Sequence, residues 1–362
     1  MQALTALIAR EPDAAMTIGA AAIGLLFGAL VSRTNYCTMG AISDWRIYGN
    51  KSRLGAVALA AATAIIGTQL LHGYGVTDLS QSMYLGPRIN WAGALLGGLL
   101  FGAGMVYAGG CPSRSLVRAA GGDARGIVSL AVMAVAAYAT IGGVLASVRV
   151  AIDGATAFEL KAYAVPTQHL GEVLSLAIGS ASQNDMIALA LVALPLLAFA
   201  LLSARVFNQP ANLASGLGVG ALVVAGWALT GLARDDFAAT PVQPTSLSFV
   251  RPVADAIDWI ERSTALGLPG FGAASVFGVI AGAFLVSWYS GRFHVLGFTD
   301  RRDVVSHVAG GTAMGIGGVL ALGCTIGQGV TGLSTLSVQS LIACAAIVAG
   351  AVIGLNRLEK SL

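Results

Sequence analysis

The stretch "GGTAMGIGGVLALGCTIGQGVT" (residues 310–331) has a near copy earlier in the chain, "GGLLFGAGMVYAGGCPSRSLVR" (residues 97–118). Six positions coincide: Gly97, Gly98, Gly102, Gly104, Gly110 and Cys111 fall opposite Gly310, Gly311, Gly315, Gly317, Gly323 and Cys324. Each copy is a glycine-rich apolar segment that ends at a Gly-Cys pair and continues with a polar stretch. This self-similarity indicates an internal repeat, and the Gly-Cys pair predicts a helix that breaks and restarts.

The composition is that of a membrane protein. Of the 362 residues, 56% are hydrophobic and 10% are charged, whereas soluble domains carry about 25% charged residues. The 48 glycines suit close packing of helices in lipid, where small residues line the interfaces. We therefore expect an all-α polytopic membrane protein.

Nine charge-poor stretches are long enough to cross a bilayer, for which about 20 apolar residues are needed. The expected spans are 14–32, 54–72, 91–110, 127–148, 186–204, 212–231, 271–290, 304–323 and 336–355. The first residues, with Arg10, Glu11 and Asp13 ahead of the first span, do not resemble a cleavable signal peptide.

The basic residues gather in alternate loops. One set of loops holds Arg33, Arg46, Lys51, Arg53, Arg114, Arg118, Arg125, Arg205, Arg292, Arg301, Arg302, Arg357 and Lys360. The other loops hold fewer basic residues or mix both signs. Because cytoplasmic loops are enriched in Lys and Arg, this bias predicts an N-terminus outside and a C-terminus in the cytoplasm.

With this topology the two repeat copies run in opposite directions. Residues 14–150 and 212–356 would form inverted repeats, with span 186–204 as the connector, within a single domain of residues 1–362. Inverted repeats are a recurrent transporter architecture whose substrate site lies near the midplane.

Two outer segments, roughly 150–180 and 232–265, are long. Within them "VPTQHLGEVLSLAIGS" (165–180) and "VRPVADAIDWIERS" (250–263) have the pattern of short helices lying at the membrane interface. We expect them to cap the bundle.

Three of the four cysteines follow a long apolar segment. Cys37, Cys111 and Cys324 each precede a short helix-compatible stretch, which predicts broken helices whose N-terminal ends point inward. Such ends attract anions, and a thiol is a weak donor and a soft, polarizable group. Cys344 lies within an apolar span, where a cysteine usually acts as a small hydrophobic residue.

The spacing of the cysteines indicates no zinc site and no disulfide framework, so we expect no metal and no cofactor. Thr325, Gln328 and Thr331 could line a hydrophilic path or brace neighbouring helices. Arg114 and Arg118 could draw anions to the inner mouth or merely follow the charge bias. His307 suits an interfacial position, and the expected spans contain no carboxylate that could carry a coupling ion.

The motifs around these cysteines resemble those of the YeeE/YedE family of bacterial inner-membrane proteins. They are "GLLFGALVSRTNYCTMGAISD", "GAGMVYAGGCPSRSLVRAAGG" and "GGTAMGIGGVLALGCTIGQGVTGLSTLS", the last being the most specific. The resemblance implies thiosulfate uptake into the cytoplasm, with Cys37, Cys111 and Cys324 passing the ion by thiol–sulfur hydrogen bonds. It also implies a TusA-like sulfurtransferase as a cytoplasmic partner, besides the thiosulfate ion and membrane lipids, and no nucleic acid.

Rival interpretations remain open on the sequence. The chain could carry another sulfur or selenium species. It could be a membrane thiol enzyme that handles sulfane sulfur, which would require an activated thiolate. A purely structural subunit is the third alternative. The chain contains no ATP-binding GxxxxGK[ST] motif, so we expect it not to power transport itself.

Overall fold

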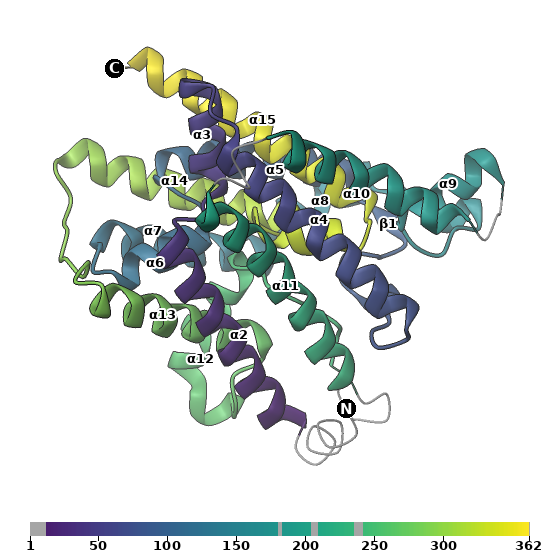
Figure 1. The fold of residues 1–362 in the computed structure, drawn as a ribbon, viewed down its shortest axis with the longest axis horizontal. Coiled ribbons are helices and arrows are strands. Elements are labelled where there is room, and N and C mark those ends of the chain that lie inside the picture. Colours follow the sequence, from purple (N-terminus) through teal and green to yellow (C-terminus); the bar gives the residue numbers. More distant parts are fainter. Residues whose placement is uncertain (1–11, 180–182, 204–208, 235–241, 362) are drawn as a thin grey trace.

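A computed structural model describes residues 12–179, 183–203, 209–234 and 242–361. Arg10, Glu11, Arg205 and the first acidic residues of the long segment 232–265 lie outside the described residues. Nearly all regular structure of the described residues is helical, which confirms the expectation of an all-α protein (Figure 1).

The helices follow one another with short breaks. Their bounds are α2 Pro12–Thr34, α3 Thr38–Tyr48, α4 Ser52–Gly73, α5 Trp91–Tyr107, α6 Pro112–Ala120, α7 Ala124–Ile141, α8 Ala146–Thr156, α9 Leu170–Ile178, α10 Asn184–Leu202, α11 Pro210–Leu232, α12 Val250–Leu266, α13 Phe271–Tyr289, α14 Arg301–Leu320 and α15 Val338–Ser361. Shorter 3₁₀ turns are η1 Leu79–Gln81 and η2 Leu160–Tyr163, and a π-helical turn, η3, covers Gly327–Gly332.

Eight segments of the described chain are long and apolar enough to cross a membrane. The expected ninth span, 304–323, falls in α14, which is not among the eight. Its first turn carries Arg301, Arg302 and Asp303. The helix nevertheless packs inside the bundle, against α5 and α7.

Two further expectations need correction. The span expected at 127–148 ends at Ile141, because Gly142 and Gly143 interrupt the helix and α8 begins only at Ala146. The stretch 165–180 is helical only over Leu170–Ile178, with His169 as its N-terminal cap. The helix expected at 250–263 is confirmed as α12 and runs on to Leu266.

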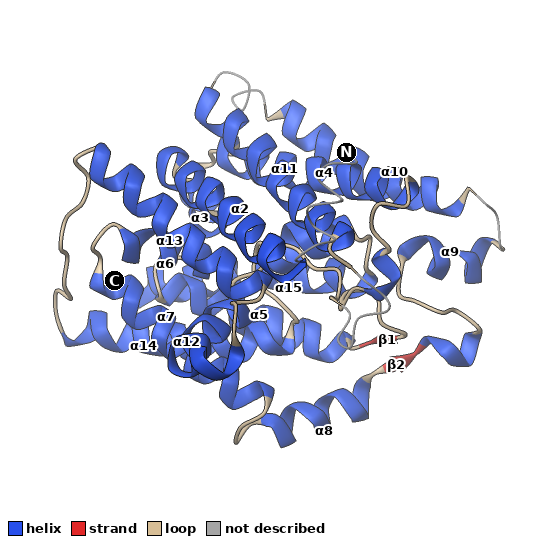
Figure 2. Cartoon of the chain, turned by 90° about the horizontal axis from the view of Figure 1, so that it is seen from below, coloured by secondary structure: helices blue, strands red, loops and turns tan. Residues whose placement is uncertain are grey.

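The sequence analysis did not predict a small two-stranded sheet. Strands β1 (Arg88–Ile89) and β2 (Phe158–Glu159) pair antiparallel, with Arg88 opposite Glu159 and Ile89 opposite Phe158. Figure 2 shows this pair beside α8 at the edge of the helical bundle.

The long helices pack in matching pairs. Helix α2 packs along α13 and α11 along α4, while α5 packs along α15 and α14 along α7. Two further contacts, α2 with α11 and α5 with α14, join these pairs. Helix α10 lies outside this arrangement, against α4 and α9.

Glycine makes the closest pairs possible. A Cβ atom at Gly28 would lie 2.1 Å from the Val279 carbonyl oxygen, across the contact between α2 and α13. A Cβ at Gly102 would lie equally close, 2.1 Å, to the Ile347 carbonyl oxygen across the contact between α5 and α15. The backbones therefore meet directly, as is typical of small-residue packing in lipid.

The start of α2 and the end of α15 lie at opposite sides of the molecule (Figure 1). On the first side, the Thr17 hydroxyl donates to the Pro269 carbonyl (2.8 Å), which ties α2 to the turn between α12 and α13. We call it the α12 side. The opposite side, where α15 ends near α3, is called the α3 side (Figure 1).

Candidate functional site

Three helices break in the same way, each just before a cysteine. A residue with left-handed backbone ends the first helix: Asn35 (φ 55°), Gly109 (φ 68°) and Leu322 (φ 58°). The cysteine follows two positions later in each case, at Cys37, Cys111 and Cys324. A left-handed residue is a common helix terminator, so this backbone pattern places a thiol at each restart.

Two of the three thiols accept a hydrogen bond from a backbone amide at the start of the segment that follows. Cys37 Sγ accepts from the Gly40 amide at 3.4 Å, and Cys324 Sγ accepts from the Gly327 amide at 3.3 Å. At the third start Pro112 occupies the first helical position, where its missing N–H does no harm.

The three cysteines gather in the interior. Cys37, Cys111 and Cys324 are 7%, 1% and 0% exposed, and all three are free thiols. The Cys37 and Cys111 thiols lie within hydrogen-bonding reach of each other. On the other side of Cys111 lies Thr325, next to Cys324 in the chain, within reach of the same thiol.

Serine and threonine hydroxyls complete this group, which we call the thiol cluster: Cys37, Cys111, Cys324, Ser113 and Thr325. Cys111 Sγ and Ser113 Oγ are 3.2 Å apart. Thr325 Oγ1 is buried and has no well-aligned hydrogen-bond partner within the described chain. Because an unsatisfied buried polar group costs about 1–3 kcal/mol, this hydroxyl is poised for a ligand or a water molecule.

Tyr36 is a further group at the cluster that the sequence analysis missed. Its side chain is buried beside the thiols of Cys37, Cys111 and Cys344. Its hydroxyl lies within hydrogen-bonding reach of Thr38 but, like that of Thr325, has no well-aligned partner within the described residues. The signal was present in "TNYCT", where the tyrosine directly precedes the cysteine of the break.

The sequence left open whether Gln328 and Thr331 line a hydrophilic path or brace neighbouring helices, and both side chains make hydrogen bonds that brace the helix break. The Gln328 side-chain amide donates to the Ala321 carbonyl, at the end of α14, while its Oε1 is buried without a partner among the described residues. Thr331 Oγ1 donates to the Leu247 carbonyl at 2.7 Å and thus braces the break against segment 242–249. Gln328 also holds the broken helix end, which explains why a polar residue is needed there.

Arg114 lies on α6, half buried, with its backbone amide directed at the Cys111 thiol. Its guanidinium group is close enough to the Cys37 thiol to interact with it electrostatically. His307 is buried in the second turn of α14, and its Nδ1 lies 3.1 Å from Asp303 Oδ1. Cys344, on α15, is only partly buried and lies near Tyr36, and a Cβ atom at Gly329 of η3 would lie 3.4 Å from its Sγ.

A fourth segment without a cysteine reaches the cluster. The backbone amide of Phe249, just before α12, lies within hydrogen-bonding reach of the Cys324 thiol. The Tyr84 hydroxyl bonds to Ser248 close to the same thiol. Sequence reasoning missed this segment because it carries neither a thiol nor a charge among residues 244–249.

The fold and this cluster define a multi-pass helical membrane protein whose interrupted helices enclose free thiols. Comparison with known proteins gives the class a family. The chain belongs to the sulphur transport family, whose profile matches residues 33–353. The resemblance expected from the cysteine motifs is thereby confirmed.

Individual relatives agree. The chain is 23% identical over 340 residues to the thiosulfate transporter TsuA of Escherichia coli K12, a match that covers 90% of each chain. It is 36% identical over 102 residues to the probable transporter YedE of the same organism, covering 28% of this chain and 23% of YedE. It is 30% identical over 122 residues to the thiosulfate transporter TsuA of Spirochaeta thermophila, covering 33% of this chain and 35% of that protein.

Proposed function

We propose that this protein takes up thiosulfate across the bacterial inner membrane into the cytoplasm, along a path through the thiol cluster. The observation that carries the proposal is the convergence of three free thiols from three separate helix breaks. Two of its relatives are named thiosulfate transporters, and they supply the choice of substrate.

The order of contacts supports a stepwise path. Cys324 adjoins segment 242–249 on the α12 side. Thr325 and Cys111 come next, and Cys37 follows. Cys37 begins α3, whose Asp44 pairs with Arg53 at 3.0 Å on the α3 side. An anion that moves from one thiol to the next would therefore pass from the α12 side to the α3 side.

The chemistry of the groups suits a soft dianion. Each thiol can donate a weak hydrogen bond to the terminal sulfur of thiosulfate. The hydroxyls of Tyr36 and Thr325, which have no well-aligned partner among the described residues, can donate to its oxygens. The N-terminal ends of α3 and α6 begin at Cys37 and Cys111, and their partial positive charge offsets part of the negative charge. Weak, divided binding lets an ion leave as well as enter.

Inverted symmetry of two halves is part of the proposal. If α2–α7 exchange with α11–α15, the pair α2 and α13 becomes the pair α11 and α4, and the pair α5 and α15 becomes α14 and α7. Cys111 then corresponds to Cys324, and Cys37 corresponds to Phe249. Matching pairs of this kind are expected of an inverted-repeat transporter, with residues 14–150 and 212–356 as repeats and α10 as connector.

The α3 side is proposed as the cytoplasmic side, on the distribution of Arg and Lys. That orientation directs the path inward and leaves the N-terminus outside. A TusA-like sulfurtransferase would meet the ion on the α3 side, and this partner rests on the family resemblance alone.

The test is uptake of labelled thiosulfate by a sulfur-limited strain that lacks its own transporters. Expression of the wild-type chain should restore uptake and growth on thiosulfate as the sole sulfur source. Well-expressed protein without either would refute thiosulfate as the substrate and leave the other sulfur and selenium species as rivals. Serine at Cys111 or Cys324 should keep part of the transport, whereas an enzyme nucleophile would lose all activity.

A further inference from the structure

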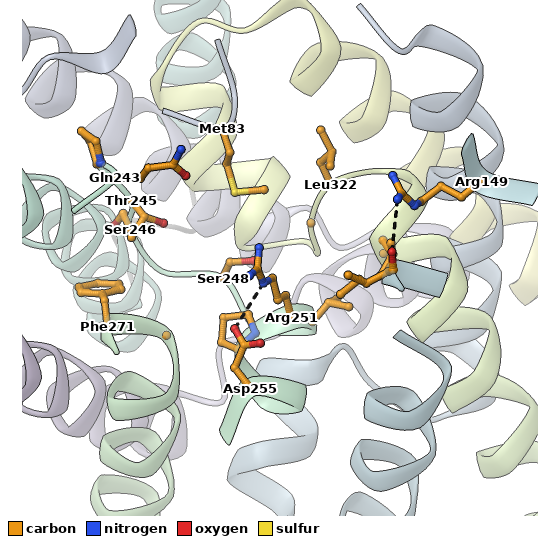
Figure 3. Close-up of a pocket in the computed structure, with 18 residues that line it drawn as sticks. Met83, Arg149, Gln243, Thr245, Ser246, Ser248, Arg251, Asp255, Phe271 and Leu322 are labelled. Atoms are coloured by element: carbon orange, nitrogen blue, oxygen red, sulfur yellow. Dashed lines mark hydrogen bonds and ion pairs between the residues drawn. The ribbon is translucent and has the colours of Figure 1, made fainter. Parts of the chain in front are cut away.

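A cavity of about 400 Å³ opens on the α12 side. Its walls come from the ends of α7 and α14, the start of α8, segment 242–249 and the first turns of α12 and α13. Its lining includes Ser248, Leu322 and Gly323, and Gly323 directly precedes Cys324. The lining of the cavity thus reaches the residue next to Cys324 in the chain, and Figure 3 shows Leu322 and Ser248 in its wall.

Two arginines face this cavity, Arg149 and Arg251 (Figure 3). Arg149 is fixed in place: Nε donates to the Thr140 carbonyl at 3.2 Å, Nη2 donates to the Ile141 carbonyl at 3.3 Å, and Nη1 lies 3.3 Å from Asp153 Oδ2. The carbonyls that close the end of α7 therefore hold the guanidinium at the cavity wall.

Arg251 is held more loosely. Its Nε lies 3.5 Å from Asp255 Oδ2, one turn along α12, and its side chain is 69% exposed. An exposed ion pair of this kind contributes about 0–1 kcal/mol. A small dianion can therefore take Arg251 from its carboxylate at little cost.

Asp255 is the group that would have to give way. The Tyr138 hydroxyl donates to its Oδ1 at 3.0 Å from α7, and burial raises its pKa above the usual range despite the nearby Arg251. Among the described residues, the other charged side chains near the cavity are paired: Asp153 with Arg149, and Asp258 with Arg262 on the next turn of α12. Arg149, Arg251 and Arg262 thus each lie against a carboxylate group.

We propose that this cavity is a capture site for small divalent oxyanions, bound by Arg251 and Arg149 ahead of Cys324, with Asp255 as the competitor for Arg251. Protonation of Asp255 removes the competing charge and leaves the site with a net positive charge. An anion bound at Arg251 in turn favours the protonated carboxyl group. Binding and proton uptake are therefore linked, and affinity rises as the pH falls toward the pKa of Asp255.

The inference rests on the proposed function for the role of the cavity in transport, but binding can be measured without transport. The assay is equilibrium binding of labelled sulfate and labelled thiosulfate to the full-length protein in detergent. The variants are Arg251→Gln and Arg149→Gln. Arg262→Gln is the matched control because it removes another arginine of α12 that pairs with Asp258 rather than Asp255.

Arg251→Gln and Arg149→Gln should each weaken binding of both anions about tenfold or more, and Arg262→Gln should not. Arg251→Lys, which keeps the charge, should retain most of the binding. Asp255→Asn should bind more tightly than wild type and lose the pH dependence. Equal binding by Arg251→Gln and Arg262→Gln, or an unchanged pH dependence in Asp255→Asn, would overturn the proposal.

Cys324→Ser separates the two claims. In this variant the cavity should still bind sulfate with wild-type affinity, while thiosulfate uptake falls. Arginine-dependent binding in a protein that does not transport thiosulfate would refute the transport proposal and keep the capture site. If uptake depends on the thiols but substitution of the two arginines leaves anion binding unchanged, the capture site is refuted and the transport proposal stands.

Discussion

The thiol cluster and the cavity on the α12 side are neighbours, yet they offer an anion different chemistry. The cavity presents guanidinium groups, one of which is largely exposed, and such groups attract any oxyanion. The cluster presents buried thiols and unpartnered hydroxyls, which suit an anion that carries sulfur. The difference teaches that capture and selection can be separated along one path, with charge near the water and soft donors where water is excluded.

The same contrast is visible within the proposed repeat. Cys37 and Phe249 both occupy the N-cap position of the helix that follows them, but only Cys37 brings a thiol. Phe249 packs on Phe27, with ring centroids 5.1 Å apart. On the half that contains Phe249, the polar side chains near the start of the helix are those of Ser248 and Arg251, which line the cavity. One half thus supplies a soft donor where the other supplies charge.

The largest effect is expected at the centre of the cluster. Cys111→Ala removes the thiol that contacts both Cys37 and Thr325, and thiosulfate uptake should fall roughly 10- to 100-fold, the equivalent of about 1–3 kcal/mol. Sulfate binding in the cavity should stay at the wild-type level. Labelled uptake and binding on the same preparation measure both.

Cys344→Ala is the control for this variant, since Cys344 is only partly buried and is not a member of the thiol cluster. It should leave uptake within about twofold of wild type. Equal losses in the two variants would show that the cluster has no special role.

An intermediate effect is expected from the carboxylate in the cavity. The wild-type KM for thiosulfate should fall as the pH decreases, because protonation of Asp255 frees Arg251. Asp255→Asn should keep a low KM throughout, on the order of three- to tenfold below wild type at neutral pH. Initial uptake rates at a series of pH values test this. A wild-type KM that rises on acidification would reverse the sign and contradict the competition.

The smallest effect is expected from a pair of tyrosines. Tyr36→Phe removes a hydroxyl that has no well-aligned partner among the described residues, so uptake should fall about threefold while the free energy of unfolding stays equal or rises by up to about 1 kcal/mol. Tyr84→Phe removes a hydroxyl bonded to Ser248 and should lower that free energy by about 1 kcal/mol. Thermal melting in detergent distinguishes the two. Destabilisation by Tyr36→Phe would mean that its hydroxyl has a partner after all.

The sequence predicts the helical fold well because hydrophobic length and glycine content are local properties. It also singles out Cys37, Cys111 and Cys324, because a cysteine after a glycine-rich helix is visible in one dimension. It does not reveal Tyr36, whose hydroxyl matters only through its position beside thiols from other breaks. Likewise Arg149 and Arg251 are more than 100 positions apart in the chain, and only the fold brings them to one cavity.

The start of α14 illustrates a different limit. Hydropathy placed a ninth span at 304–323, but Arg301, Arg302 and Asp303 give that helix a polar first turn, and it packs against α5 and α7. The charge-poor pattern locates this helix in the sequence, whereas its packing partners are known only from the fold.

The most direct test of the central claim is an experimental structure of the protein prepared with thiosulfate. The account predicts density for the ion between Cys111 and Cys324, within hydrogen-bonding distance of the Thr325 hydroxyl. Density confined to the cavity at Arg251, with the three thiols in contact only with protein while uptake is intact, would contradict it.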